Sequence, residues 1–448
     1  MTHRLPDITH ALLDAARKAG ADAADSMAVQ DTSVHIDVRE SNLEQAERSE
    51  GVDIGLRVFV GNRQANVSAS DTSAATLQTM AERAVAMARE APEDPYLGLA
   101  DPGEIATSWD IDALELSDTS PEPDPAALQT DALAAEAAAQ AVAGVNQVQS
   151  ASAAYGASEV HLAATNGFSG GYERTSRSIS CVAISGSGTG MERDYDGDMR
   201  IFQADLRDPE EIGRIAGERA VQLQGARKPQ TGTYDVVFDE RISSSLIGHV
   251  LAAVNGSAIA RGSSWLRDAM GEQILPEGLS LIEDPHRPRV TGTRPFDAEG
   301  LATRKRQIVM DGVLQGWTLD LSTARKLGLT STGNAARSTS GPPSPSPWNI
   351  ELTQGTVSRD DLLRDMGTGL LVTSMIGSTI NATTGDYSRG ASGFWIENGE
   401  IAYPVNECTI AGNLRDMMRR IIPANDARTH LSRVVPSLMI EGMTLAGA

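Results

Sequence analysis

The sequence predicts an α+β protein, with helices packed on antiparallel sheet in its N-terminal part and mostly β-structure after it. Two observations carry this prediction. Up to about residue 228, segments of helical periodicity alternate with long stretches rich in β-branched residues, whereas from residue 233 onward strands and hairpin turns dominate. A chain of 448 residues is long enough for two or three domains. We therefore expect an N-terminal domain at 1–228 and a C-terminal domain at 229–448.

The N-terminal part begins with a predicted helix. Its apolar residues recur at helical spacing and Gly20 follows as a stop signal; they are Ile8, Leu12, Leu13 and Ala16. Residues 24–69 read as strands, with a hairpin turn at Gly61-Asn62. A second helix is expected to start at Asp71, with Met87 on its buried face.

The next segment repeats this order of elements. Asp124-Pro125 and Asp208-Pro209 each combine an N-cap residue with proline at the first helical position, so helices should begin there, on either side of strands within 145–205. The halves 1–115 and 125–225 therefore look alike, and both closing helices contain the string ERAV. Likenesses this short between Ala/Glu-rich helices are also common by chance, so an internal duplication stays open.

The C-terminal part carries strong hairpin signals. Asp311-Gly312 and Asn398-Gly399 each lie between apolar runs and predict two-residue turns. One helix is expected at 240–254 and a short one from Ser358. The proline-rich segment 338–347 predicts a loop.

Composition excludes several classes of function. The chain has 60 acidic and 38 basic residues, a formal charge of −22, so direct binding of nucleic acid through phosphate contacts is not expected. Its two cysteines make no disulfide framework. Neither a signal peptide nor an apolar run of membrane-spanning length is found, so we expect a cytoplasmic protein that does not cross a membrane.

Motifs for hydrolysis or nucleotide binding are missing. The seven histidines are all at least seven residues apart, which excludes HExxH, although a metal site built from distant residues stays open. The chain contains no GxSxG and no Walker A sequence. On its own, His249 reads as a core or interface histidine on the predicted helix.

Several blocks, in order along nearly the whole chain, resemble the TldD/PmbA family, once described as a modulator of DNA gyrase. They are 55–71, 164–178, 311–337, 384–405, 409–417 and 438–447. The resemblance implies a barrel-like C-terminal domain. It also implies a heterodimer of TldD-type and TldE-type (PmbA) subunits that degrades small or unfolded peptides.

Within that family this sequence resembles the TldE branch. TldD-type subunits carry an HExxxH zinc motif and a later Cys ligand; here the motif positions are Ser244, Ser245 and His249, and 420–432 contains no Cys. Serine hydroxyls are poor zinc ligands. The resemblance therefore implies no catalytic residue, metal or cofactor in this chain, with zinc in the TldD-type partner. Four further family-motif positions have no role that the sequence assigns: Asn334, Arg337, Tyr387 and Asn413.

The expected function is thus that of a non-catalytic TldE-type subunit of a heterodimeric zinc metallopeptidase. The alternative is a stand-alone, homodimeric peptide-binding protein, and whether the chain is itself an enzyme stays open. A bound peptide would add a strand to a sheet by main-chain hydrogen bonds. The acidic charge favours neutral or basic peptides, unless it lies on outer surfaces.

Overall fold

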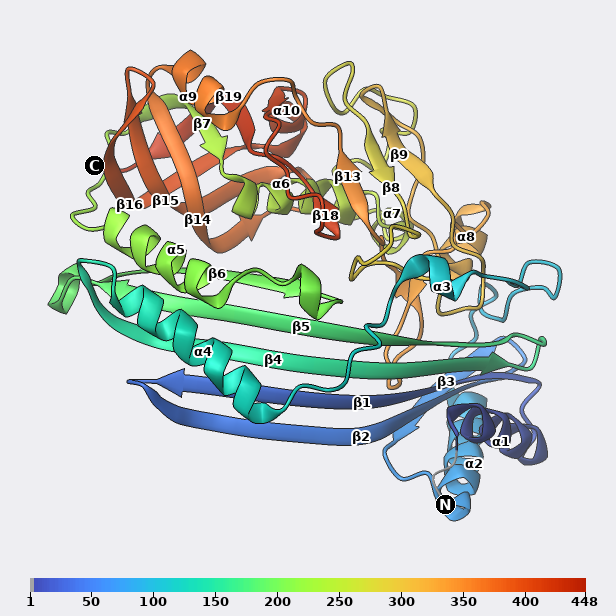
Figure 1. Ribbon diagram of the computed structural model, residues 1–448. Coiled ribbons are helices and arrows are strands. Elements are labelled where there is room, and N and C mark those ends of the chain that lie inside the picture. Colours follow the sequence, from blue (N-terminus) through green and yellow to red (C-terminus); the bar gives the residue numbers. More distant parts are fainter. Residues whose placement is uncertain (1–3) are drawn as a thin grey trace.

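The computed structural model describes residues 4–448, apart from the side chain of Ser378. A broad sheet forms one half of the molecule (Figure 1). A barrel lies over one end of its strands and a smaller sheet over the other. The predicted fold class is confirmed: helices pack on antiparallel sheet in the N-terminal part, and the C-terminal part is mainly β.

The N-terminal part consists of two groups of elements in the same order, each with a helix, three strands and a closing helix. The first group is α1 (Leu5–Ala19), β1 (Ala23–Arg39), β2 (Asn42–Val60), β3 (Arg63–Ala69) and α2 (Ala74–Glu90). The short α3 (Ile111–Leu114) precedes the second, α4 (Pro125–Gln140), β4 (Val145–Ala164), β5 (Ser169–Ser185), β6 (Glu192–Arg200) and α5 (Pro209–Gln222). The sheet order is β3-β2-β1-β4-β5-β6, antiparallel throughout, so β1 and β4 pair at its centre.

Local signals set these boundaries. Gly20 ends α1 in the left-handed region at φ 95°, and the carboxylates of Asp124 and Asp208 cap α4 and α5. The N-cap of α2 is Ser73, two residues after the expected start. Met87 on α2 is exposed, contrary to the prediction, because it lies off the stripe of α2 that packs on the sheet.

All four long helices cover one face of the sheet. Side chains alternate between faces along a strand, so the even-numbered residues of β1 point the same way. Ala24 and Ala28 pack with α1 and α2, while Val34 and Ile36 pack with α4 and α5. The odd-numbered residues of β1 occupy the opposite face, which lies against the C-terminal part.

The barrel of the C-terminal part closes through five strands. They are β7 (Gly232–Phe238), β14 (Gly369–Ile380), β15 (Asp386–Glu397), β16 (Glu400–Asn413) and β19 (Leu438–Ala446), with β17 (Ile421–Pro423) attached to β19. Closure follows because β16 pairs with both β15 and β19. The pair β7–β14 is parallel, the one exception to the antiparallel pattern among these strands.

A smaller five-stranded sheet, ordered β10-β9-β8-β13-β18, packs beside the barrel. Its strands are β8 (Leu281–Glu283), β9 (Arg306–Met310), β10 (Val313–Leu314), β13 (Ile350–Leu352) and β18 (Arg433–Val434). A separate short ladder joins β11 (Ala335–Ala336) and β12 (Ser344–Pro345). The helices are α6 (Glu240–Ala253), α7 (Gly256–Ala260), α8 (Leu321–Leu327), α9 (Arg359–Met366) and α10 (Leu414–Met418).

The predicted hairpins are confirmed. Met310 pairs with Val313 around Asp311-Gly312, and both turn residues have positive φ, 50° and 79°. Asn398-Gly399 joins β15 to β16 in the same way, and Gly61-Asn62 joins β2 to β3. Two-residue turns of this kind match the twist of the strands they connect.

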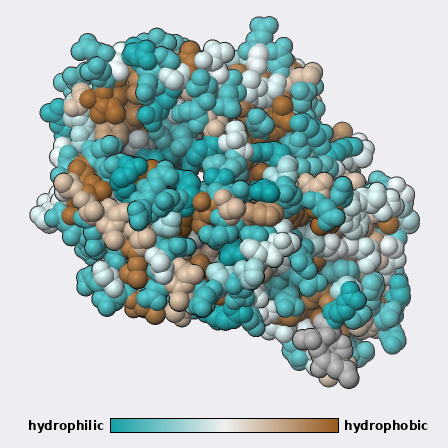
Figure 2. All heavy atoms as spheres, viewed as in Figure 1, coloured by the Kyte–Doolittle hydropathy of each residue, from teal (hydrophilic) through white to brown (hydrophobic). Residues whose placement is uncertain are grey.

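Exposed residues on the face shown in Figure 2 are mostly hydrophilic, with apolar residues scattered in small groups. Among the described residues, no helix has both the length and the apolar character that a membrane crossing requires.

A buried ion cluster joins the two parts. The Asp25 carboxylate on β1 accepts from Arg57 Nε of β2 at 2.8 Å and also binds Arg337, which follows β11. Side chains of all three are at most 5% exposed. Burial alone would raise the pKa of Asp25, but the charges of Arg337 and Arg57 and their hydrogen bonds hold it below its usual range. The carboxylate is therefore ionised and paired.

The loop after β11 also touches the sheet directly. Gly55 of β2 lies so close to Thr339 that a Cβ there would collide with the Thr339 carbonyl. Because Gly55 has no side chain, the loop can pack directly on the odd-numbered face of β2, next to Arg57.

Two further acids lie buried near this junction. Asp297 accepts backbone N–H bonds from Glu299, Leu301 and Ala335, at 2.9–3.1 Å. Glu299 accepts from the Leu321 backbone N–H at 2.9 Å. Burial first, and then the neighbouring Asp297 carboxylate, raise the pKa of Glu299 to about 8.

We expect Asp25→Asn to destabilise the protein by about 3 to 5 kcal/mol, because it leaves two buried guanidinium groups without their counter-charge. Chemical denaturation followed by circular dichroism measures this. The control is Asp14→Asn, which removes an exposed pair with Arg17 and should cost less than about 0.5 kcal/mol. Equal effects of the two substitutions would contradict a central role for the buried cluster.

We expect Glu299→Gln to stabilise the protein relative to wild type increasingly as the pH rises from about 5 to about 8. The pKa of Glu299 is raised by folding, so its contribution is fully present below the unfolded value near 4.5 and is lost as the pH rises through about 8. The slope is about 1.4 kcal/mol per pH unit. Gln retains the acceptor for Leu321. Denaturation curves of both proteins at several pH values test this, and parallel pH profiles would refute it.

Candidate functional site

The helix predicted to carry degenerate metal positions faces a cleft between the two parts. Helix α6 begins at the Asp239 cap, and its Ser244 and Ser245 line a cavity of about 550 Å³. The opposite wall comes from the N-terminal sheet, through Val182 of β5 and Tyr195 of β6. Strands β14 and β15 close the third side. The cavity therefore requires both parts of the chain.

Cationic side chains dominate the charge of this cavity. Arg193, Arg241 and Arg389 line it, against the single carboxylate of Asp194. Arg241 Nη1 pairs with Asp194 at 3.1 Å and bridges β6 to α6. Arg389 forms no ion pair among the described residues, and its Nε is buried without a hydrogen-bond partner. The cleft is thus electropositive in a protein of charge −22.

His249 lies behind this lining, one turn and a half along α6 from Ser244. Its ring packs edge-on against Tyr387 of β15, with the ring centroids 5.8 Å apart. Burial, followed by the charge of Arg389, lowers the pKa of His249, and its Nε2 has no hydrogen-bond partner within the part of the chain that the structure describes. The ring is therefore neutral near pH 7.

Tyr387 completes this small group. It is buried, and its hydroxyl lies 3.3 Å from the sulfur of Met375. Burial raises the pKa of Tyr387 to about 12, so the phenol keeps its proton. Of the four family-motif positions without a predicted role, Tyr387 is the one that lies beside His249.

The residues at this site do not fit a zinc ion. Ser244 and Ser245 offer only neutral hydroxyl groups, and the Ser245 hydroxyl donates to the Ile242 carbonyl at 2.7 Å. The Arg389 guanidinium brings positive charge to the place a cation would need. Among the described residues, no three of His, Cys, Asp and Glu lie together as a metal-binding group. Cys408 is buried beside the Ala391 carbonyl, and burial raises its pKa to about 11.

Two of the other family-motif positions hold the C-terminal part together. Asn334 donates to Glu283 Oε1 at 2.7 Å and to the Ser346 carbonyl. Asn413 caps α10 by accepting from the Arg415 backbone N–H at 3.0 Å.

The third position, Arg337, belongs to the ion cluster with Asp25 and not to the cleft. Asn334, Arg337 and Asn413 therefore act on the packing of the fold, away from Ser244.

Sequence reasoning missed the arginines of the cleft. Arg389 follows Tyr387 by two residues on one strand, so alternation would have placed both side chains on the same face. Arg193 and Asp194 carry no such signal, because β6 meets α6 only through the docking of the two parts.

Comparison with known proteins agrees with this architecture. The chain matches the models of PmbA/TldA metallopeptidase domain 1 over residues 24–88, the central domain over 118–224 and the C-terminal domain over 231–447. Metalloprotease PmbA of Escherichia coli O157:H7 is 35% identical over 431 residues, which are 95% of this chain and 93% of that relative. A PmbA homolog from Haemophilus influenzae is 34% identical over 447 residues, 97% of this chain and 94% of the homolog.

Solved structures show the same fold. A candidate modulator of DNA gyrase from Bacteroides thetaiotaomicron has a TM-score of 0.89 at 27% identity and covers 98% of each chain. TldE of Thermococcus kodakarensis has a TM-score of 0.84 at 20% identity, over 98% of this chain and 99% of TldE. The predicted resemblance is confirmed: the chain belongs to the PmbA/TldD metallopeptidase family.

Proposed function

We propose that this chain is the non-catalytic, TldE-type subunit of a heterodimeric TldD/TldE zinc metallopeptidase that acts on small or unfolded peptides. The observation that carries the proposal is the lining of the cleft at α6. Ser244 and Ser245 stand there at the two motif positions where a TldD-type subunit has His and Glu, and Arg389 lines the same cleft. Zinc would then be held by the TldD-type partner, and this chain would bind neither metal nor cofactor.

The charge of the cleft bears on the peptides that such a complex takes. Three arginines and one aspartate line it, so it favours acidic segments or peptide carboxylates. This differs from the preference for neutral or basic peptides expected from net charge, because only one carboxylate lines the cleft. The free thiols Cys181 and Cys408 are both buried, which suits a reducing cytoplasm.

A stand-alone homodimeric peptide-binding protein is the second candidate, and one feature favours it. Strand β3 pairs with β2 only from Ile54 to Val60, so 42–53 of β2 forms a free edge of the sheet. Residues 42–51 are exposed. An extended peptide could add to that edge by main-chain hydrogen bonds.

We expect the wild-type chain to raise the peptidase activity of a TldD-type partner at least several-fold when the two are mixed. Release of a fluorophore from an unstructured peptide measures this, with each chain alone and both combined. Serum albumin replaces this chain in the control. A partner equally active without the chain would favour the stand-alone reading, and chelator-sensitive cleavage by this chain alone would overturn the proposal.

We expect the chain purified alone in metal-free buffer to hold far less than one zinc, and Ser244→His with Ser245→Glu to take up zinc only weakly. The double variant supplies two groups beside His249, but the later Cys and the outer groups that orient imidazoles, worth about 10- to 100-fold, are absent. No peptidase activity should appear. Elemental analysis with the fluorogenic assay tests this; about one tightly held zinc per wild-type chain would contradict it.

A further inference from the structure

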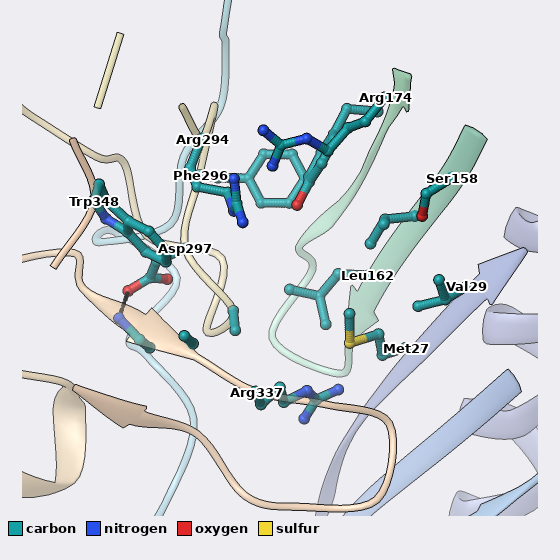
Figure 3. Close-up of a pocket in the computed structure, with 15 residues that line it drawn as sticks. Met27, Val29, Ser158, Leu162, Arg174, Arg294, Phe296, Asp297, Arg337 and Trp348 are labelled. Carbon is teal, nitrogen blue, oxygen red and sulfur yellow. Dashed lines mark hydrogen bonds between the residues drawn. The ribbon is translucent and has the colours of Figure 1, made fainter. Parts of the chain in front are cut away.

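A second cavity lies at the junction of the two parts, away from the cleft at α6. Its volume is about 280 Å³, and it shares no lining residue with that cleft. One wall is the odd-numbered face of β1 with the adjoining face of β4 and β5. The other wall comes from two C-terminal segments, 294–298 and 335–348 (Figure 3).

The middle of the cavity is apolar. Met27 and Val29 of β1 lie beside Leu162 of β4, and Phe296 faces them from the C-terminal part. Phe296 packs edge-on against Tyr172, with ring centroids 5.6 Å apart. This surface can cover an aliphatic or aromatic group of a ligand.

Two arginines lie close together at one end of the cavity (Figure 3). Arg174 Nη2 donates to the Thr291 carbonyl at 2.5 Å, and Arg294 Nη1 donates to the same carbonyl at 3.1 Å. Arg294 also reaches the Thr293 carbonyl at 2.7 Å. Each guanidinium has five N–H donors, so both keep donors to spare.

Neither arginine has an acidic partner. No ion pair found among the described residues includes Arg174 or Arg294, although the chain has 22 more acidic than basic residues. Two guanidinium groups that converge without a counter-charge repel each other, and a bound anion would relieve this repulsion.

The other charged groups at the cavity already have partners within the chain. Arg337 is bound to Asp25, and the Asp297 carboxylate accepts three backbone N–H bonds. Asp31 lines an adjoining cavity that also contains Arg174, but it forms no ion pair with it. The Asp297 carboxylate keeps its charge, so the lining as a whole is net positive, and Arg174 and Arg294 supply the cationic donors that a ligand can reach.

We propose that this junction cavity binds a small carboxylate that bears an apolar or aromatic group, with the carboxylate on Arg174 and Arg294 and the apolar group between Met27 and Phe296. A cavity of about 280 Å³ holds one such unit and not an extended peptide. The carboxyl terminus of a peptide and a free arylalkyl carboxylic acid share this chemistry. The proposal does not depend on the proposed peptidase partnership.

Binding at this place has a mechanical consequence. The two arginines come from different parts of the chain, Arg174 from β5 and Arg294 from the C-terminal segment. One carboxylate that bridges them adds a link between the parts, parallel to the Asp25 cluster. A ligand that binds the folded but not the unfolded chain raises the midpoint temperature of thermal unfolding.

Three probes distinguish the sources: N-acetylphenylalanine for a peptide terminus, 3-phenylpropionate for a free acid, and N-acetylphenylalaninamide without a carboxylate. Calorimetric titration of the full chain, up to about 10 mM probe, should show binding of one or both acids, with a raised Tm, and none of the amide. An acid that binds alone identifies the source, whereas binding of both shows that the site recognises the aryl carboxylate that they share. Failure of both acids, or equal binding of the amide, would overturn the proposal.

The variant Arg294→Gln should lower the affinity for the acid at least about tenfold, which is the usual contribution of a charge-assisted hydrogen bond. Arg174→Gln should do the same. Arg83→Gln is the matched control, since Arg83 is exposed on α2 and lies outside the cavity. Circular dichroism confirms that each variant folds. Unchanged affinity in both cavity variants would overturn the proposal, as would an equal loss in Arg83→Gln.

Discussion

The rest of the structure depends on one buried carboxylate. Asp25 sits on the sheet face that is free of helices, between a guanidinium from its own sheet and one from the C-terminal part. Leaving either charge buried and unpaired would be costly, so the loop that carries Arg337 is held against β2. Both cavities lie between this face of the sheet and the C-terminal part. Their shape therefore depends on how the sheet and the C-terminal part are docked.

Local chemistry made much of the fold predictable. The caps at Asp124 and Asp208 and the Asp-Gly and Asn-Gly turns act within a few residues, so short stretches of sequence determine them. The parallel pairing of β7 with β14 joins residues more than 130 positions apart and leaves no periodic signal. Arg337 was noticed as part of a motif, but its partner Asp25 lies in another domain, and a single sequence does not connect them.

The difference between local signals and long-range contacts also explains which parts of the site could be predicted. Helical spacing alone placed Ser244, Ser245 and His249 on one helix, and the structure keeps them there. The opposite wall comes from β5 and β6, which reach α6 only because the domains dock. Arg389 is an intermediate case, since alternation along β15 puts it on the face of Tyr387. Its importance was hidden because an arginine in a strand usually faces solvent.

Net charge was the least informative quantity, because it is a sum without positions. Exposed glutamates lie along the free edge of β2, at Glu44, Glu47 and Glu50, while the arginines of both cavities turn inward between the domains. At physiological ionic strength, charges separated by more than about 8 Å in water are largely screened from each other. A carboxylate inside either cavity therefore responds mainly to the guanidinium groups within hydrogen-bonding reach. An acidic protein can thus bind acidic ligands, provided that its domains enclose the basic minority of its side chains.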